Sequence, residues 1–110
     1  MVNTNLVNKI RGNYARVLDN IATASAKVGR NPTDVTTVGI SKTFDLSVVE
    51  AGYRAGLRDL GENRVQEAQS KIFAIEHSVR WHLVGHLQRN KASTAVNLFN
   101  IIQLLIYSVV

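Results

Sequence analysis

Apolar residues recur at two different spacings along the chain, and the spacing predicts which segments are helices and which are strands. Over residues 5–28 an apolar residue returns every three or four positions, which is typical of a helix with one buried face. Thr4 or Asn5 is the expected N-cap of this helix, and Gly29 follows its last apolar position as a stop. Residues 30–34, which include the only proline, then predict a turn.

Beyond this turn, short runs rich in β-branched residues alternate with helical segments. The patterns predict strands over residues 35–41, 57–60, 79–84 and 101–107. Helices are expected over residues 65–75 and 89–98, and from a cap at Asp45 or Ser47 to Gly56. Strands that alternate with helices predict a parallel sheet joined by right-handed crossovers. We therefore expect an α/β fold with a leading helix and about four parallel strands.

The length of the chain limits how much of such a fold it can hold. With 110 residues it has the size of a single domain, and we expect one domain over residues 1–110. A complete (β/α) barrel of TIM type, with eight strands, needs about 250 residues. The expected architecture is therefore a partial barrel of this type, about half of the whole.

The composition and the charge pattern exclude several classes of site. Because the chain has no cysteine, it can form no disulfide, zinc–thiolate site or thiol nucleophile. The formal charge of +5 comes from basic and acidic residues that are mixed along the chain, whereas nucleic-acid binders usually gather basic residues on one face. We expect no nucleic-acid partner, and the small positive excess suits a phosphorylated small molecule.

The two ends of the chain bear on where the protein resides. The N-terminal residues MVNTNLVNKIRG are too polar for a secretory signal, so a cytoplasmic protein is expected. Residues 92–110 carry no charge, but polar residues are spread through them, so a buried helix and strand are favoured over a membrane anchor. No metal site is expected, since the histidines lie in different local contexts.

Polar clusters follow three of the predicted strands, at the end where ligands bind in parallel α/β folds. These clusters are Ser41-Lys42-Thr43, Gly61-Glu62-Asn63 and Gly85-His86-Leu87-Gln88. Asn63 lies 21 residues after Lys42, and His86 lies 23 residues after Asn63, which is one strand–helix unit each time. The three clusters should therefore point into one space.

Lys42 is the residue whose position favours covalent chemistry. Desolvation at the end of an apolar strand favours the neutral amine of a lysine, which attacks aldehydes to form a Schiff base. The aldehyde would belong to a sugar-like substrate or to pyridoxal phosphate. The alternative is a lysine that extends its ammonium group from the strand end into water.

The other residues with candidate chemistry each allow more than one interpretation. Asn63 would hydrogen-bond a ligand or act as the N-cap of the helix that begins near residue 65. Glu62 would take part in acid–base chemistry or lie at the start of that helix, where its charge suits the helix dipole. His82, within a strand, is expected to be buried with satisfied hydrogen bonds, whereas His86 is the better candidate for a ligand contact.

Four sequence blocks resemble one known family, the pyridoxal phosphate homeostasis proteins. The blocks are Gly29-Arg30-x-Pro32, VGISKT from Val38 to Thr43, AGLRDLGENRVQE from Ala55 to Glu67, and RWHLVGHLQRNK from Arg80 to Lys91. The resemblance implies a barrel similar to the N-terminal domain of alanine racemase. It also implies that Lys42 holds pyridoxal 5'-phosphate as an internal aldimine, with Asn63, His86 and Gln88 near the cofactor.

Members of this family are regarded as carriers and regulators of the cofactor, without a settled catalytic activity. The resemblance therefore implies a role in the balance of intracellular vitamin B6 pools. Two departures stand in or beside the matched blocks: Phe44-Asp45 replaces a Lys-Pro pair of the family, and Arg64 replaces a tyrosine. The family's second half, with the loops that hold the cofactor phosphate, is missing, so the chain looks like a truncated member.

Two other functions are compatible with the same residues. A half-barrel with two open sheet edges predicts a fragment that binds no cofactor and persists by self-association. A Schiff-base aldolase would also use a strand-end lysine, with Glu62 as the nearby candidate for its acid–base partner.

Overall fold

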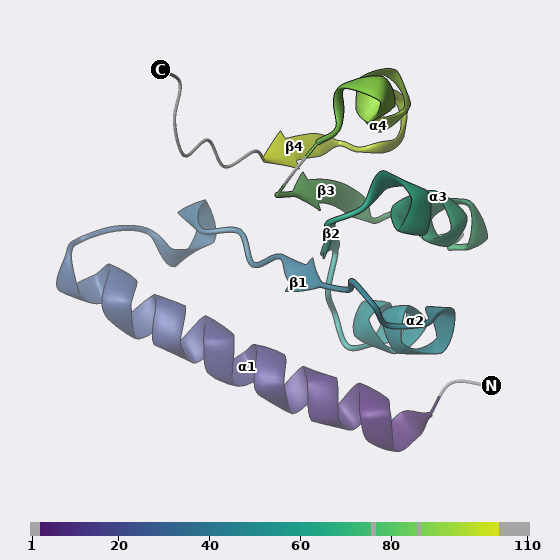
Figure 1. Ribbon diagram of the computed structural model, residues 1–110. Helices are drawn as coiled ribbons and strands as arrows, with labels where there is room; N and C mark the ends of the chain where they lie inside the picture. The colour runs from purple at the N-terminus through teal and green to yellow at the C-terminus, as the bar shows by residue number, and fades with distance from the viewer. Residues whose placement is uncertain (1–2, 76, 86, 104–110) are drawn as a thin grey trace.

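The computed structural model describes residues 3–75, 77–85 and 87–103, in which strands and helices alternate after a leading helix (Figure 1). The leading helix is α1 (Thr4–Lys27), and the short 3-10 helix Pro32–Asp34 follows it. The alternating elements are β1 (Gly39–Ile40), α2 (Leu46–Arg54), β2 (Asp59–Glu62), α3 (Val65–Ala74), β3 (Arg80–Val84), α4 (Ala92–Leu98) and β4 (Ile101–Gln103). The predicted order of elements is confirmed.

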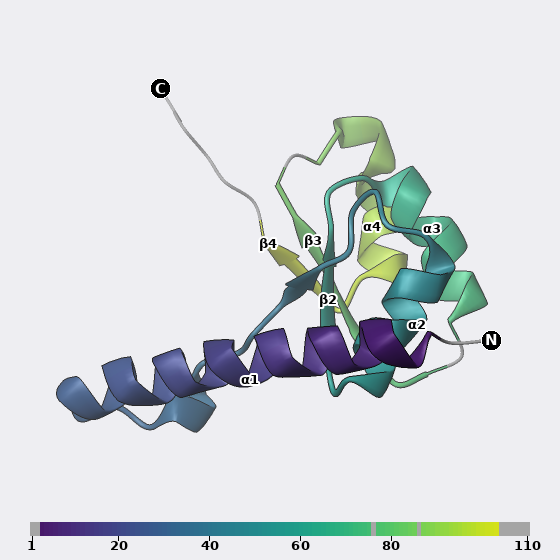
Figure 2. The same ribbon diagram turned by 90° about the horizontal axis from the view of Figure 1, so that it is seen from below.

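The four strands form one parallel sheet in the order β1-β2-β3-β4. Each strand pairs with the next along the chain, with Leu60 opposite Trp81 and His82 opposite Ile101. The connecting helices α2, α3 and α4 cover the same face of the sheet (Figures 1 and 2). Consecutive parallel strands with their crossover helices on one face are the arrangement of a (β/α) barrel. The predicted α/β fold, a part of such a barrel with a leading helix, is therefore confirmed.

The main hydrophobic core lies between the sheet and this helix layer. Because strand residues alternate between the two faces, Leu60, Trp81 and Leu83 point toward the helices and are buried. They pack with apolar residues from the helices and the helix ends, namely Val49, Val65, Ala68, Ala95 and Phe99. The opposite side of the sheet carries Gly61 and His82 in register with Ile101. Packing on the helix side thus holds the strand ends, and the loops that follow them, at one edge of the sheet.

Side chains cap the first two helices. Asn3 is the N-cap of α1, and its side-chain oxygen accepts hydrogen bonds from the backbone N–H groups of Asn5 and Leu6. The prediction of Thr4 or Asn5 as the cap is therefore wrong by one or two residues. Asp45 caps α2 through Oδ1, which confirms one of the two predicted caps of that helix.

The leading helix packs on α2 through its first turns, and Ser25 is buried near its other end. Val7 is buried against Ala51 of α2 and against Ala55, which is the C-cap of α2. The later turns of α1 extend past the sheet (Figure 2). Gly29 follows the helix with a φ of +68°, in the left-handed region, which confirms the expected stop. None of the helices that the structure describes has both the length and the apolar character of a membrane span.

Several predicted boundaries differ from the structure, and pairing with a neighbour explains the strands. β1 has only two residues because, in the described sheet, only Gly39 and Ile40 pair with β2, so most of the predicted segment 35–41 lies outside the ladder. β2 begins and ends two residues later than predicted, since Gly61 and Glu62 pair with His82 and Leu83. The predicted helix 89–98 divides into the 3-10 helix Arg89–Lys91 and α4. The end of the predicted strand 101–107 lies outside the described residues.

Candidate functional site

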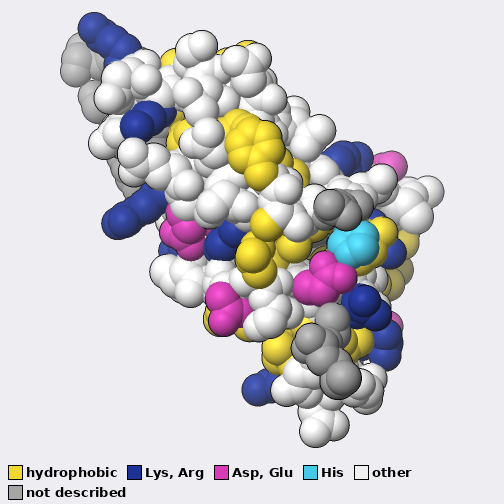
Figure 3. All heavy atoms as spheres, turned by 90° about the vertical axis from the view of Figure 1, so that its right-hand side faces the viewer, with side chains coloured by type: hydrophobic (Ala, Val, Ile, Leu, Met, Phe, Trp, Pro, Cys, Tyr) yellow, Lys and Arg dark blue, Asp and Glu magenta, His cyan; other side chains and the backbone are white. Residues whose placement is uncertain are grey.

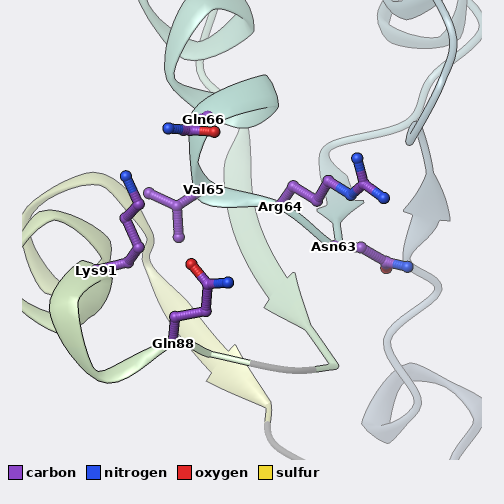
Figure 4. A pocket seen from close by; sticks show the side chains of 6 residues that line it. All are labelled: Asn63, Arg64, Val65, Gln66, Gln88 and Lys91. Carbon is purple, nitrogen blue, oxygen red and sulfur yellow. The ribbon is translucent and has the colours of Figure 1, made fainter.

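An open cleft of about 470 Å³ lies at the carboxyl end of the sheet, between the loop that leads into α3 and the loop that leads into α4 (Figure 4). The residues that line it are Asn63, Arg64, Val65, Gln66, Gln88 and Lys91. Its volume is in the range of small-molecule sites, about 300–1,000 Å³. Asn63 and Gln88, two residues that the sequence predicts at the ligand, therefore line one cleft.

The lining of this cleft is polar and its charged groups are basic. Three side-chain amides and two basic side chains line it, and the described lining includes no carboxylate. Gln66, Gln88 and Lys91 lie on one side of the cleft, whereas Asn63 and Arg64 extend toward the other side (Figure 4). Amides both donate and accept hydrogen bonds, and cations bind phosphate and carboxylate groups. The donor set fits a small polar compound that carries an anionic group.

Lys42 lies on the neighbouring loop, between β1 and α2. Its side chain is exposed and is not among the residues that line the cleft. The residue before it, Ser41, is buried and donates its backbone N–H to the Gly61 carbonyl at 2.9 Å. The residue after it, Thr43, has a φ of +66°, and the Phe44 N–H closes the turn on the Ser41 carbonyl at 3.2 Å. Lys42 is thus on a tight turn at the same edge of the sheet as the cleft.

Glu62 is the residue that departs most from its predicted place. It lies inside β2 rather than at a helix start, and its side chain is fully buried. Each of its carboxylate oxygens is 3.2 Å from Lys71 Nζ, and one of them accepts a hydrogen bond from the Ser41 hydroxyl. The helix-start interpretation is wrong because the strand continues through Glu62. Glu62 is also absent from the lining of the cleft, so the acid–base partner that an aldolase would need is not found there.

The interpretation of Asn63 as a helix cap is wrong as well. Arg64 occupies the N-cap position of α3, and no side chain caps this helix. Asn63 precedes the cap, is half-buried and lines the cleft. Its amide therefore stays available to a bound molecule.

A second polar cluster lies on the opposite side of the sheet from the helices. His82 is 3% exposed, with Nε2 2.9 Å from Asp59 Oδ1 and Nδ1 3.1 Å from Gln103 Oε1. Arg80 contacts the same Asp59 carboxylate. Burial alone would raise the pKa of Asp59, but the hydrogen bonds of Arg80 and His82 outweigh it and hold the pKa below its ordinary value. The prediction of His82 as a buried, satisfied histidine is confirmed.

Two further predictions from the sequence, the ligand contact of His86 and the absence of a metal site, fall partly or wholly on residues outside those that the structure describes. His86 lies outside the described residues, so its place relative to the cleft stays a prediction. Within residues 3–75, 77–85 and 87–103, no cluster of three or more histidine, aspartate or glutamate side chains could hold a metal ion.

Lys71 and Glu67 were not predicted, although they contact the loop of Lys42. Lys71 Nζ donates to the Ser41 carbonyl at 2.7 Å, and Glu67 Oε1 accepts the Thr43 N–H at 2.6 Å. Their spacing of four residues on α3 is a sequence signal for an ion pair on a helix. It does not reveal that the pair is turned inward onto a neighbouring loop.

Fold and cleft together define the class of the protein: a (β/α)-barrel unit with an open cleft of small-molecule size at its strand ends and a lysine on the loop after the first strand. No family model matches the chain. Its sequence is similar to curated proteins named pyridoxal phosphate homeostasis protein. The one from Escherichia coli (strain K12) is 36% identical over 98 residues, which cover 86% of this chain and 42% of that protein. The one from Haemophilus influenzae is 34% identical over 99 residues, with coverages of 87% and 42%.

Solved structures of related proteins share the fold. A crystal structure described as an unknown protein from Bifidobacterium adolescentis matches with a TM-score of 0.74 and 30% identity, over 93% of this chain and 46% of that chain. PipY of Synechococcus elongatus PCC7942, solved with PLP bound, matches with a TM-score of 0.60 and 37% identity, over 73% of this chain and 38% of PipY.

The chain is therefore a homologue of the pyridoxal phosphate homeostasis proteins, and the resemblance predicted from the sequence is confirmed. The chain spans about two fifths of the length of the curated relatives that it matches.

Proposed function

We propose that the chain binds pyridoxal 5'-phosphate (PLP) in intracellular vitamin B6 homeostasis and that Lys42 is the residue to which the cofactor is linked. The observation that carries this proposal is the cleft of amides and cations beside the loop of Lys42, at the carboxyl end of the sheet. The names of the curated relatives and the PipY structure with PLP bound support the choice of cofactor.

The linkage requires one amine and one aldehyde. PLP would supply the aldehyde and Lys42 the neutral amine, whose two hydrogens would leave with the aldehyde oxygen as water. The amides of Asn63 and Gln88 would orient the ring by hydrogen bonds, and His86, on the same loop as Gln88, belongs to the proposed set. Among the described lining residues, Arg64 and Lys91 would supply positive charge for the phosphate.

A carrier or regulator, rather than an enzyme, is the role that we propose. The described lining of the cleft offers amides and cations but no carboxylate, and the buried Glu62 is engaged with Lys71. Reversible storage of an aldehyde needs only the amine and a cleft that retains the phosphate. A cytoplasmic location and a single domain over residues 1–110 stay predictions.

The test is spectroscopic and covalent. PLP titrated into the full chain should produce a visible absorbance band, and borohydride reduction should then leave the label on the peptide that contains Lys42. Lys42→Ala should lose both signals, whereas Lys27→Ala, at an exposed lysine of α1, should keep them. A chain that shows neither band nor labelled Lys42 peptide at saturating PLP would contradict the proposal.

A second candidate, a fragment that binds no cofactor and self-associates, rests on the open sheet. β1 and β4 each have one strand neighbour in the described sheet, and Ile40 and Ile101 on them are 45% and 39% exposed. Exposed apolar strands at a sheet edge favour pairing with another chain. Sedimentation velocity distinguishes the candidates: a PLP-labelled monomer supports the first, and a dimer or larger species that takes up no PLP supports the second.

A further inference from the structure

One buried lysine of α3 is tied to both ends of the short turn that carries Lys42. The ammonium group of Lys71 donates a hydrogen bond to the Ser41 carbonyl at 2.7 Å. The same nitrogen lies 3.0 Å from Glu67 Oε1, and this oxygen accepts the backbone N–H of Thr43 at 2.6 Å. Because Ser41 and Thr43 are the residues on either side of Lys42, the backbone is anchored both before and after it.

Glu62 holds Lys71 in place from β2. Each of its oxygens is 3.2 Å from Lys71 Nζ, its side chain is fully buried, and Lys71 itself is 5% exposed. A lysine ammonium has three hydrogens, and three acceptor groups surround this one: the Ser41 carbonyl and the carboxylates of Glu62 and Glu67. A buried ion pair adds little net stability, because desolvation offsets its attraction. The role of the Glu62–Lys71 pair is therefore better explained by the backbone conformation that it maintains around Lys42.

The conformation that it holds is an unfavourable one for the residue concerned. Thr43 is β-branched and has a φ of +66°, in the left-handed region where such residues are outliers. The Thr43 amide, and after it the Lys71 ammonium, lower the pKa of Glu67, so this carboxylate is ionised at neutral pH and can serve both partners. The hydrogen bonds that Lys71 and Glu67 make to Ser41 and Thr43 thus stabilise the strained turn from outside.

We propose that Lys71 is a positioning residue for Lys42. With Glu62 and Glu67 it fixes the backbone on both sides of Lys42 and sets the direction in which the Lys42 amine leaves the turn. This inference rests on the proposed covalent role of Lys42 and extends it to three residues that do not line the cleft.

The first variants for the test remove the buried pair as a unit in the full chain. Glu62→Gln combined with Lys71→Met takes away both charges together, which avoids a lone buried charge that would unfold the protein. The glutamine amide still offers an oxygen to the Ser41 hydroxyl, so only the lysine contacts are lost. Lys27→Met is the matched control, because it makes the same change at an exposed lysine of α1.

A second pair of variants acts at the less buried end of the cluster. Glu67→Ala removes the acceptor of the Thr43 N–H, whereas Glu67→Gln keeps an oxygen at that place. Because the Glu67 side chain is 30% exposed, both changes should leave a folded protein even where the double variant does not fold.

Two readouts follow the turn directly. Without PLP, hydrogen exchange of the Thr43 amide by NMR should be about tenfold or more faster in the double variant and in Glu67→Ala, and near normal in Glu67→Gln. With PLP, the rate constant for growth of the visible band should fall about 10- to 100-fold in the first two, since misplacement by about 1 Å costs up to that factor. Glu67→Gln should recover most of the rate. Lys27→Met should change neither readout.

The outcomes separate this inference from the function on which it rests. Unchanged Thr43 exchange in Glu67→Ala and in a folded double variant would overturn the role of Lys71, whether or not PLP binds. Unchanged rates of band growth would overturn it as well, while the linkage to Lys42 stands. A chain without substitutions that forms no linkage overturns the function of Lys42 instead, and Thr43 exchange then decides alone whether Lys71 holds the turn.

Discussion

His82 Nε2 lies 2.9 Å from Asp59 Oδ1, and this contact joins the middle of β3 to the start of β2 on the side of the sheet away from the helices. Arg80 contacts both oxygens of the same carboxylate, and Gln103 of β4 lies against the other ring nitrogen of His82. The cluster therefore links three adjacent strands through side chains, in addition to their backbone ladder.

Asp59→Asn is expected to lower the free energy of unfolding at neutral pH. It should also make that free energy depend less on pH in the acidic range. The pKa of Asp59 is held below its ordinary value of 3.8, because the contacts with Arg80 and His82 outweigh the effect of burial. The ionised carboxylate thus stabilises the fold above that value, and this stabilisation is lost as the pH falls through the lowered pKa. Urea unfolding between about pH 2 and about pH 7 measures the effect, with Asp19→Asn on α1 as the control. Equal acid dependence of the Asp59 variant and the unsubstituted chain would contradict this prediction.

Leu83→Ala should be a strongly destabilising truncation in the core. Leu83 is fully buried between β3 and the helices, and loss of such a leucine side chain costs about 2–5 kcal/mol. The midpoint of urea unfolding should fall accordingly. Phe73→Ala provides the contrast, because Phe73 of α3 is 71% exposed. Its removal should change the free energy of unfolding by about 0.5 kcal/mol or less. The face of the molecule that carries the helices shows apolar side chains among charged ones (Figure 3). Similar losses for the two variants would argue against the core described here.

Asn3→Ala should destabilise α1 at its start. The Asn3 side chain accepts two backbone N–H groups, and loss of such a cap costs about 1 kcal/mol. Asn3→Asp keeps the acceptor oxygen and should retain most of the stability. Urea unfolding followed by far-ultraviolet circular dichroism measures both, and an alanine variant as stable as the aspartate variant would show that the cap has no energetic role.

Gly29→Ala tests the end of the same helix. The φ of +68° is left-handed, and nothing lies within 4 Å of the position that a Cβ would occupy, so any cost arises from the backbone alone. We expect a loss of about 1 kcal/mol for alanine and a smaller loss for Gly29→Asn, since asparagine tolerates this region better. Equal stabilities of the alanine variant and the unsubstituted chain would indicate that the helix ends in another way.

The order of the elements could be predicted because it depends on local patterns. Three- and four-residue spacing predicts α1, and the alternation of β-rich runs with helical segments predicts the parallel sheet. Strand ends could not be predicted in the same way. Gly61 and Glu62 are poor strand formers, and they belong to β2 only because β3 pairs with them.

The site could be predicted in part for the same reason. The carboxyl ends of parallel strands meet at one edge, so the loops of Asn63 and Gln88 could be expected to meet, and these residues line one cleft. The partner of Glu62 could not be foreseen, because Lys71 lies nine residues further on, on another element, and only tertiary packing turns it inward. Lys42 and His86 as ligand residues stay predictions.

Trp81, the single tryptophan of the chain, is 4% exposed in β3 and packs in the core against the helix layer. Its environment changes from apolar to aqueous when that core opens, so its emission reports the opening of the sheet–helix contact without any added dye. Trp81 belongs to β3, and Gln88, which follows β3 in the chain, lines the cleft. A chromophore that bound the cleft as proposed and accepted energy from the indole should dim this emission, so Trp81 would report both unfolding and occupancy.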